Sequence, residues 1–283
     1  MTTPRTLTLA LSLAALPGCI AFNDDCQALV DNPNERVAFV AKGTEIFLDR
    51  PNARHANNAI AQSAADAFVW VFNSQPDATS KVDFGMINGG AVRDQGACVL
   101  RTILREGPLT RGVLGEILPF ENAVRVVDLS EQEVFDTLEL SVSRLFAAPT
   151  PITSPSGGFL QVSKEISMEV DCTRTSGSRI TSLRIGSQTV TRGMFRPFPG
   201  TKYRVALPGF ILAGNDGYTL LAGKGEDPSR NPGQAQRFGG IDSRITMAYL
   251  LQSDFNKTIE NGLRVDANRI RFLNCTTPSR PAQ

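Results

Sequence analysis

Residues 209–218, GFILAGNDGY, place an aromatic side chain at the end of an apolar strand and one carboxylate in the glycine-rich turn that follows. Gly214 and Gly217 permit positive φ angles, and Asn215 tolerates them better than most residues. The turn therefore holds Asp216 as a hydrogen-bond acceptor beside Phe210. An aromatic face next to an acceptor suits a nucleoside, whose base stacks and whose ribose hydroxyls donate. Taken alone, the segment is better interpreted as a hairpin turn whose Asp bonds its own backbone.

Three further segments accompany it at defined distances along the chain. Ile87–Asp94 (INGGAVRD) is a second glycine-rich loop after an apolar strand, Leu118–Asn122 (LPFEN) offers a second aromatic in a constrained loop, and Gly158–Ser163 (GFLQVS) opens another strand. Together, in this order, the four segments resemble the C-terminal domain of the 5'-nucleotidase family. The resemblance runs from about Glu45 to about Phe272.

The pattern of apolar residues predicts an α+β fold, because helices and strands are interspersed without regular βαβ repetition. We expect a single domain over residues 35–275 with a mixed β-sheet packed by helices, as the resemblance also implies, and a tail over 276–283. Thr110 and Asp242 are predicted N-caps, and Ser130 with Glu133 forms a predicted capping box. Predicted strands cover 37–40, 45–48, 82–87, 124–129, 160–170, 182–185, 203–207 and 269–273. Predicted helices cover 57–72, 110–118, 130–145 and 242–252.

The resemblance assigns ligand contacts to particular positions. Phe120 and Phe210 match the two aromatic side chains that sandwich a nucleobase, and Asp216 matches the carboxylate that accepts from ribose hydroxyls. An arbitrary Phe is more often a core residue, but here each ring sits directly in a Pro or Gly turn. Arg93 matches an arginine that reaches sugar or phosphate oxygens, and Asn88 matches an asparagine at the mouth of the base pocket.

Arg54 is open to two interpretations, a further substrate arginine or an ordinary solvated one. The chain departs from the family pattern at Ala91, Asn215 and Lys164, where Gly, Gly and Ser-Gly are usual. These departures leave the aromatic pair and the carboxylate intact, and they bear on the sugar and phosphate end of the site.

The catalytic half of the family's machinery is not found in this sequence. In the family, hydrolysis occurs at two metal ions held by several His and Asp and an Asn, and such a centre stabilises both the attacking and the leaving oxygen. This chain has a single histidine, His55, which we expect at the surface. We therefore assign no catalytic residue, no metal site and no cofactor to this chain.

The N-terminal residues resemble a bacterial lipoprotein signal. Arg5 precedes an apolar run that ends in Leu16-Pro17-Gly18-Cys19. We expect a signal peptide over 1–18, a lipid on Cys19, a polar tether over 19–34, and an exported protein anchored in the cell envelope, with a plain secretory signal as the alternative. Ile20 favours the outer membrane if the cell has one.

Four cysteines remain after Cys19: Cys26, Cys98, Cys172 and Cys275. An even number in an exported protein predicts two disulfides. Sequence does not fix their pairing; joining Cys26 to Cys275 near the mature termini, and Cys98 to Cys172, is the convenient choice.

Charge excludes one class of partner. The 29 basic and 28 acidic residues nearly balance and form no basic patch, so we expect no nucleic-acid partner.

The resemblance leaves two possible functions for this chain. The chain is the recognition half of a split nucleotidase that works with a separate metallophosphatase, or it is a non-catalytic, lipid-anchored nucleoside-binding or scaffolding module.

Overall fold

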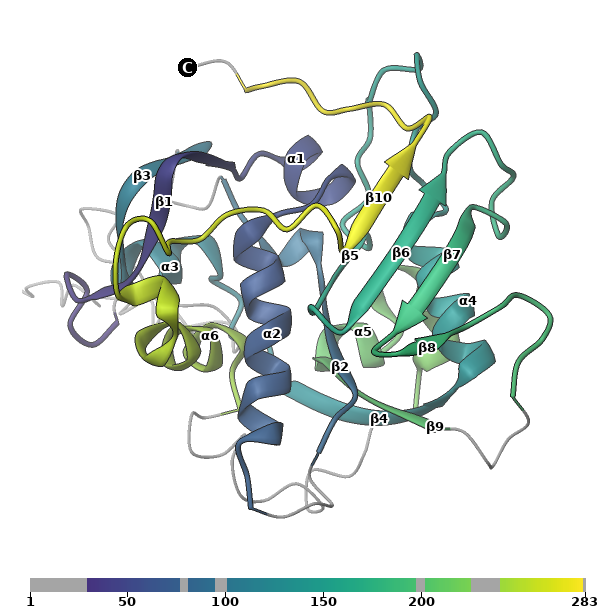
Figure 1. Cartoon of the computed structure of the whole chain (residues 1–283), viewed down its shortest axis with the longest axis horizontal. Helices are drawn as coiled ribbons and strands as arrows, with labels where there is room; N and C mark the ends of the chain where they lie inside the picture. The colour runs from purple at the N-terminus through teal and green to yellow at the C-terminus, as the bar shows by residue number, and fades with distance from the viewer. Residues whose placement is uncertain (1–29, 77–80, 95–100, 197–201, 225–239, 282–283) are drawn as a thin grey trace, which may run out of the picture.

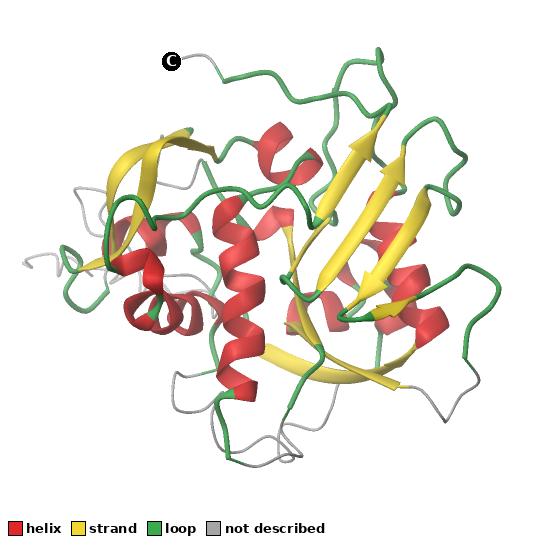
Figure 2. Cartoon of the chain, viewed as in Figure 1, coloured by secondary structure: helices red, strands yellow, loops and turns green. Residues whose placement is uncertain are grey.

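A computed structural model describes residues 30–76, 81–94, 101–196, 202–224 and 240–281 (Figure 1). Cys19, Cys26, Cys98 and the predicted signal peptide lie outside these residues, as does most of the tether. Strands and helices are interspersed along the chain, which confirms the α+β class (Figure 2). No helix in the described ranges has the length and apolar character needed to cross a membrane.

The central sheet has the strand order β4–β9–β2–β5. Strand β9 runs parallel to β2 and antiparallel to β4, and β5 runs antiparallel to β2, so the sheet is mixed. Its strands are β2 (Phe84–Asn88), β4 (Val124–Ser130), β5 (Leu160–Val162) and β9 (Lys202–Pro208).

The other strands form two smaller sheets within the described part of the chain. One has the order β10–β6–β7–β8, with β10 parallel to β6, and lies beside α4 in Figure 1. Its strands are β6 (Ile166–Asp171), β7 (Ile180–Ile185), β8 (Gln188–Thr189) and β10 (Ile270–Leu273). The other is an antiparallel pair of β1 (Arg36–Phe47) and β3 (Ile103–Thr110). Strand β1 replaces the two predicted strands, because Gly43, with φ of 70°, is accommodated at an irregularity between Val40 and Glu45 instead of ending the strand.

Both faces of the central sheet are buried, because successive side chains of a strand point to opposite faces. Phe84 and Met86 belong to the core shared with α4 and the β6–β7 strands, whereas Ile87 belongs to the core shared with α2. Val205 and Ala206 on β9 divide in the same way. This explains why β2 and β9 appear in the sequence as continuous apolar runs.

Local capping signals fix the starts of three described helices, α2, α3 and α4. Thr110 accepts from Val113 N at 3.4 Å, and Ser130 and Glu133 form the predicted capping box. Asn58 caps α2 by accepting from Ile60 N, so this helix begins two residues later than predicted. The helices are α1 (Arg50–His55), α2 (Ala59–Asn73), α3 (Arg111–Ile117), α4 (Glu131–Val142), α5 (Gly209–Leu212) and α6 (Asp242–Gln252).

Two predictions about single polar residues were wrong. Asp242 is the first residue of α6 and not its cap, which is Ile241. His55 is buried, with 2% of its surface exposed, because it packs against the ring of Phe146 and accepts from Phe146 N at 3.0 Å. Burial lowers the pKa of His55 to about 4.

The predicted disulfide pairing was also wrong, although Cys172 and Cys275 are both bridged as expected. They are bonded to each other, with their Cα atoms 4.9 Å apart. The reason is the parallel pairing of β10 with β6, in which Leu273 lies opposite Asp171 and delivers each cysteine just beyond the paired ends. The bridge therefore joins the C-terminal segment to the sheet.

Candidate functional site

The site lies at one end of the central sheet, in the loops that follow β2 and β9 and the loop that precedes β4. Strands β2 and β9 are parallel, so their C-terminal ends share one edge of the sheet, and antiparallel β4 begins at that edge, where Val124 pairs with Pro208. The loops after β2 and β9 and the loop before β4 therefore converge. These are three of the four segments that carried the sequence resemblance, now brought together in space.

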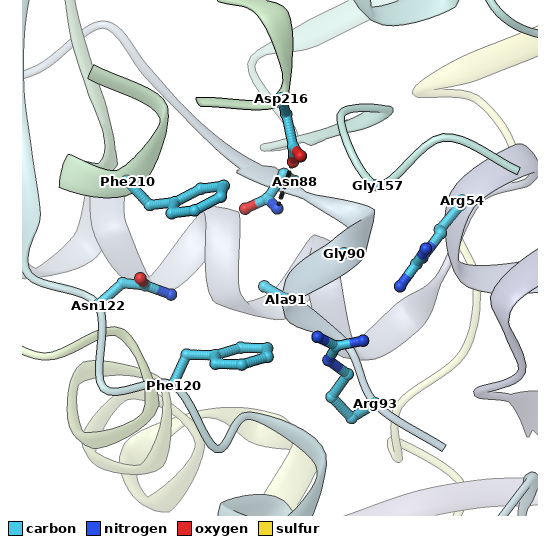
Figure 3. A pocket seen from close by; sticks show the side chains of 10 residues that line it. All are labelled: Arg54, Asn88, Gly90, Ala91, Arg93, Phe120, Asn122, Gly157, Phe210 and Asp216. Atoms are coloured by element: carbon cyan, nitrogen blue, oxygen red, sulfur yellow. Dashed lines mark hydrogen bonds between the residues drawn. The ribbon is translucent and has the colours of Figure 1, made fainter. Parts of the chain in front are cut away.

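A cavity of about 270 Å³ opens between these loops (Figure 3). All six predicted ligand residues line it. The lining consists of Arg54, Asn88, Gly90, Ala91, Arg93, Phe120, Asn122, Gly157, Phe210 and Asp216.

Two phenylalanine rings flank the cavity from opposite sides (Figure 3). Phe210 lies on α5 with 41% of its surface exposed, and Phe120 is half-buried in the loop before β4. Neither ring belongs to either hydrophobic core, so the interpretation of these residues as core side chains was wrong. The guanidinium carbon of Arg93 lies 4.5 Å from the ring centroid of Phe120, within the range of a cation–π contact.

Asp216 is held at the cavity by a strained turn. Its φ is 55°, between Gly214 at 87° and Gly217 at 92°, so the left-handed residue between the glycines is Asp216 and not Asn215. Asn215 instead donates to the carbonyl of Phe210 at 2.9 Å. The turn is anchored by the buried Tyr218, whose hydroxyl donates to the carbonyl of Gly158. Asp216 itself is an exposed residue.

Asn88, another residue of the cavity lining, contacts this carboxylate. Its Nδ2 donates to Asp216 Oδ2 at 3.2 Å. Its Oδ1 is buried and has no hydrogen-bond partner within the described residues. A buried acceptor without a partner is costly unless a ligand or water donates to it.

The two arginines lie together on the side of the cavity away from Asn122 (Figure 3). Arg54 reaches it because α1 packs closely on the turn after β2, where a Cβ at Gly89 would lie only 2.3 Å from the carbonyl oxygen of Ala53. Burial, followed by the charge of Arg93, lowers the pKa of Arg54. Arg54 is therefore a half-buried residue of the cavity lining.

Sequence reasoning missed two residues of the lining that matter to its shape. Gly157 accepts from Gly90 N at 2.9 Å and so joins two glycine loops beside Asp216. Asn122 follows Phe120 by two residues, and its polar side chain in that loop was the available signal.

Among the departures from the family pattern, Ala91 lines the cavity, whereas Lys164 is exposed and does not.

The described residues contain no group of three or more His, Cys, Asp or Glu side chains placed to hold a metal ion. The side chains that line the cavity present two aromatic faces, a carboxylate, two amides and two guanidinium groups.

Two curated relatives align with part of this chain. An apyrase from Tabanus yao is 29% identical over 189 residues, which are 64% of this chain and 32% of the apyrase. A 5'-nucleotidase from Vibrio cholerae is 28% identical over 171 residues, 60% of this chain and 24% of that enzyme. The chain thus spans a third or less of the length of these two relatives.

Solved structures share the fold. The 5'-nucleotidase precursor from Thermus thermophilus superposes with a TM-score of 0.61 at 25% identity, over 85% of this chain and 40% of that one. The NAD nucleotidase of Haemophilus influenzae, at 16% identity, has the same fold with a TM-score of 0.55 over 85% of this chain and 38% of its own. The sequence model of the 5'-nucleotidase C-terminal domain matches residues 36–223. Since that match covers well over half of the sequence, the chain belongs to the 5'-nucleotidase C-terminal domain family.

Proposed function

We propose that this chain binds nucleosides and nucleotides in the cavity, as the recognition domain of a 5'-nucleotidase. The observation that carries the proposal is that the aromatic and the cationic side chains lie at different parts of the cavity. Phe120 and Phe210 flank one part of the cavity, while Arg54 and Arg93 gather on the side away from Asn122, with Asp216 between (Figure 3).

A nucleotide has the same sequence of chemistries along its length. Its base stacks between the rings, its ribose hydroxyls donate to Asp216, and its phosphate lies toward the two guanidinium groups. Stacking of a base on an aromatic side chain contributes about 1–3 kcal/mol and tolerates any base. Arginine suits the phosphate because its planar donors match the phosphate oxygens.

For hydrolysis, the proposal places the two-metal centre on a separate metallophosphatase polypeptide. The family resemblance supports a division between recognition and hydrolysis, since the family's catalytic metals belong to another domain. We further propose that the protein is exported and lipid-anchored at Cys19. The C-terminal-domain chain would then present nucleotides to its partner at the cell envelope.

Binding is tested by calorimetry with adenosine, AMP and free adenine. Asp216→Asn should weaken adenosine binding roughly tenfold to a hundredfold, because a hydrogen bond to a charged acceptor contributes about 1.5–3 kcal/mol. It should change adenine binding little, since adenine has no ribose. Asp136→Asn on α4 is a matched control, because Asp136 is exposed and outside the cavity. A folded wild-type protein that binds none of the three ligands at millimolar concentration would refute the proposal.

Hydrolysis is tested separately by release of phosphate from AMP. With Mn²⁺, Zn²⁺ or Co²⁺ added, the purified chain should remain at the level of the protein-free blank, because the proposal places the metal ligands elsewhere. Release that copurifies with the chain and disappears in the Phe210→Ala variant would show that this chain carries its own catalytic centre. AMP binding without release, even when a metallophosphatase from the same cell is added, would instead favour a non-catalytic binding or scaffolding module.

A further inference from the structure

A fully buried carboxylate lies behind one wall of the cavity. Asp242, the first residue of α6, is 1% exposed and does not line the cavity. Its Oδ2 accepts from Asn122 Nδ2 at 3.0 Å, and its Oδ1 accepts from Ser243 N at 2.7 Å. Its own backbone N donates to the carbonyl of Asn122 at 2.9 Å. Asp242 therefore holds Asn122 by both side chain and backbone.

The loop that carries Phe120 is attached to α6 through this contact. Beyond Asn122, Ala123 pairs with Ile241 in an antiparallel bridge, and Val124 N donates to the carbonyl of Gly240 at 2.7 Å. Figure 3 places Asn122 next to both phenylalanine rings, at the part of the cavity away from the arginines. The wall beside the rings thus depends on the start of a helix that the family's sequence model does not reach.

The state of the carboxylate determines how Asn122 is held. An ionised carboxylate only accepts hydrogen bonds, so it fixes the amide with its NH₂ group toward Asp242 and leaves Oδ1 as the end available to other donors. A protonated carboxyl can donate as well as accept, so either end of the amide can then face it. Protonation therefore removes the single orientation of Asn122.

We propose that Asp242 is a positioning residue of the nucleoside pocket: in its ionised form it fixes Asn122 and the adjoining Phe120 loop in the arrangement that accepts the base. The inference rests on the nucleoside-binding function proposed above, but it concerns a residue that does not contact the ligand.

The surroundings of Asp242 place the change between its ionised and protonated forms near neutral pH. Burial raises its pKa to about 7; the hydrogen bonds from Asn122 and Ser243 oppose the rise, and the charge of Glu121 adds to it. Arg244 pairs with Glu121 at 3.3 Å. The charged side chains of the elements packed on α6 are Asp66 of α2, Arg111 and Glu116 of α3, Arg36, Lys42 and Glu45 of β1, and Asp254 of the 3-10 helix η6 (Asp254–Asn256).

As pH rises, the affinity for adenosine should increase while the stability of the folded protein decreases. The pKa of Asp242 is raised above its unfolded value, so the folded state binds more protons and the protein loses stability as pH rises from about 4 to about 7. Fixing of Asn122 requires the ionised form, so affinity should rise over pH 6–8. A carboxylate with a purely structural role would not strengthen binding while the fold becomes less stable.

The experiment is calorimetric titration of the full chain with adenosine at pH 6, 7 and 8, because adenosine does not itself titrate in this range. If only the ionised form is competent, its population rises about tenfold between pH 6 and 8, and the dissociation constant should fall by about the same factor. Asp242→Asn should reduce this change to less than twofold. Asp136→Asn, the exposed control, should retain the wild-type profile.

Two further variants locate the effect. Glu121→Gln removes the neighbouring negative charge and should move the midpoint of the profile to lower pH, because that charge raises the pKa of Asp242. In an Asn122→Ala background, Asp242→Asn should have no additional effect on affinity, since the proposed coupling runs through Asn122.

The outcomes separate this inference from the proposed function. Adenosine binding at pH 8 with the expected profile supports both. Adenosine binding that is independent of pH in the wild type overturns the role of Asp242 and leaves the pocket assignment intact, and this arm holds even if Asp242→Asn does not fold. No binding at any pH refutes the pocket assignment itself.

Discussion

Truncating either ring of the pocket, Phe120→Ala or Phe210→Ala, should weaken adenosine binding roughly tenfold to a hundredfold. Each substitution removes one stacking face worth about 1–3 kcal/mol without changing any charge. The fold should tolerate both, since neither ring belongs to a hydrophobic core. The loss should be similar for adenosine, guanosine and inosine, because every base offers a π face. Calorimetry on the folded variants measures it.

Two controls make the result specific to stacking. Phe210→Trp keeps an aromatic face and should retain most of the affinity. Met194→Ala truncates a side chain that is 76% exposed and lies outside the cavity, so it should have no effect. Phe120→Ala also removes the ring under Arg93, so it should affect AMP more than Phe210→Ala does. Wild-type affinity in both alanine variants would mean that the rings do not clamp the base.

Arg269→Ala should lower the free energy of unfolding by about 3–5 kcal/mol, the largest effect on stability that we expect. The guanidinium of Arg269 makes two 2.8 Å contacts with the carboxylate of Asp66 and also donates to the carbonyls of Gln62 and Val162. Asp66 in turn accepts from Lys164 N at 2.9 Å. Truncation would leave a buried carboxylate without its counter-charge. Urea denaturation measures the change.

Arg271, two residues further along the chain in β10, provides the matched control. Its side chain is 72% exposed and pairs with Glu169 at 3.1 Å, so Arg271→Ala should cost less than about 1 kcal/mol. Adding Asp66→Asn to Arg269→Ala should recover part of the loss, because the unpaired charge is then absent. A loss below 1 kcal/mol for Arg269→Ala alone would show that Asp66 finds another partner or water.

Local signals in the sequence predicted the elements that present the site. The apolar runs of β2 and β9 fixed two buried strands, and the capping box at Ser130 fixed the start of α4. The loops after those strands carry Gly and Pro at positions with few allowed conformations, which made Phe210 and Asp216 identifiable. The sequence also predicted a helix at Asp242 but assigned this residue as the N-cap, which is Ile241. The position of a cap depends on the backbone angles of a single residue, and the sequence pattern does not give these.

The sequence by itself determined the α+β class, the order of the elements and the residue types that the pocket presents, because these depend on periodicity and on turn chemistry within a few residues. Only the tertiary structure decided which distant segments meet. It placed Arg54 at the cavity, buried His55 against Phe146, joined Cys172 to Cys275 and set Asp242 behind Asn122. Each of these contacts joins segments separated by many residues, and local spacing carries no information about which strands pair or which loops share an edge of a sheet.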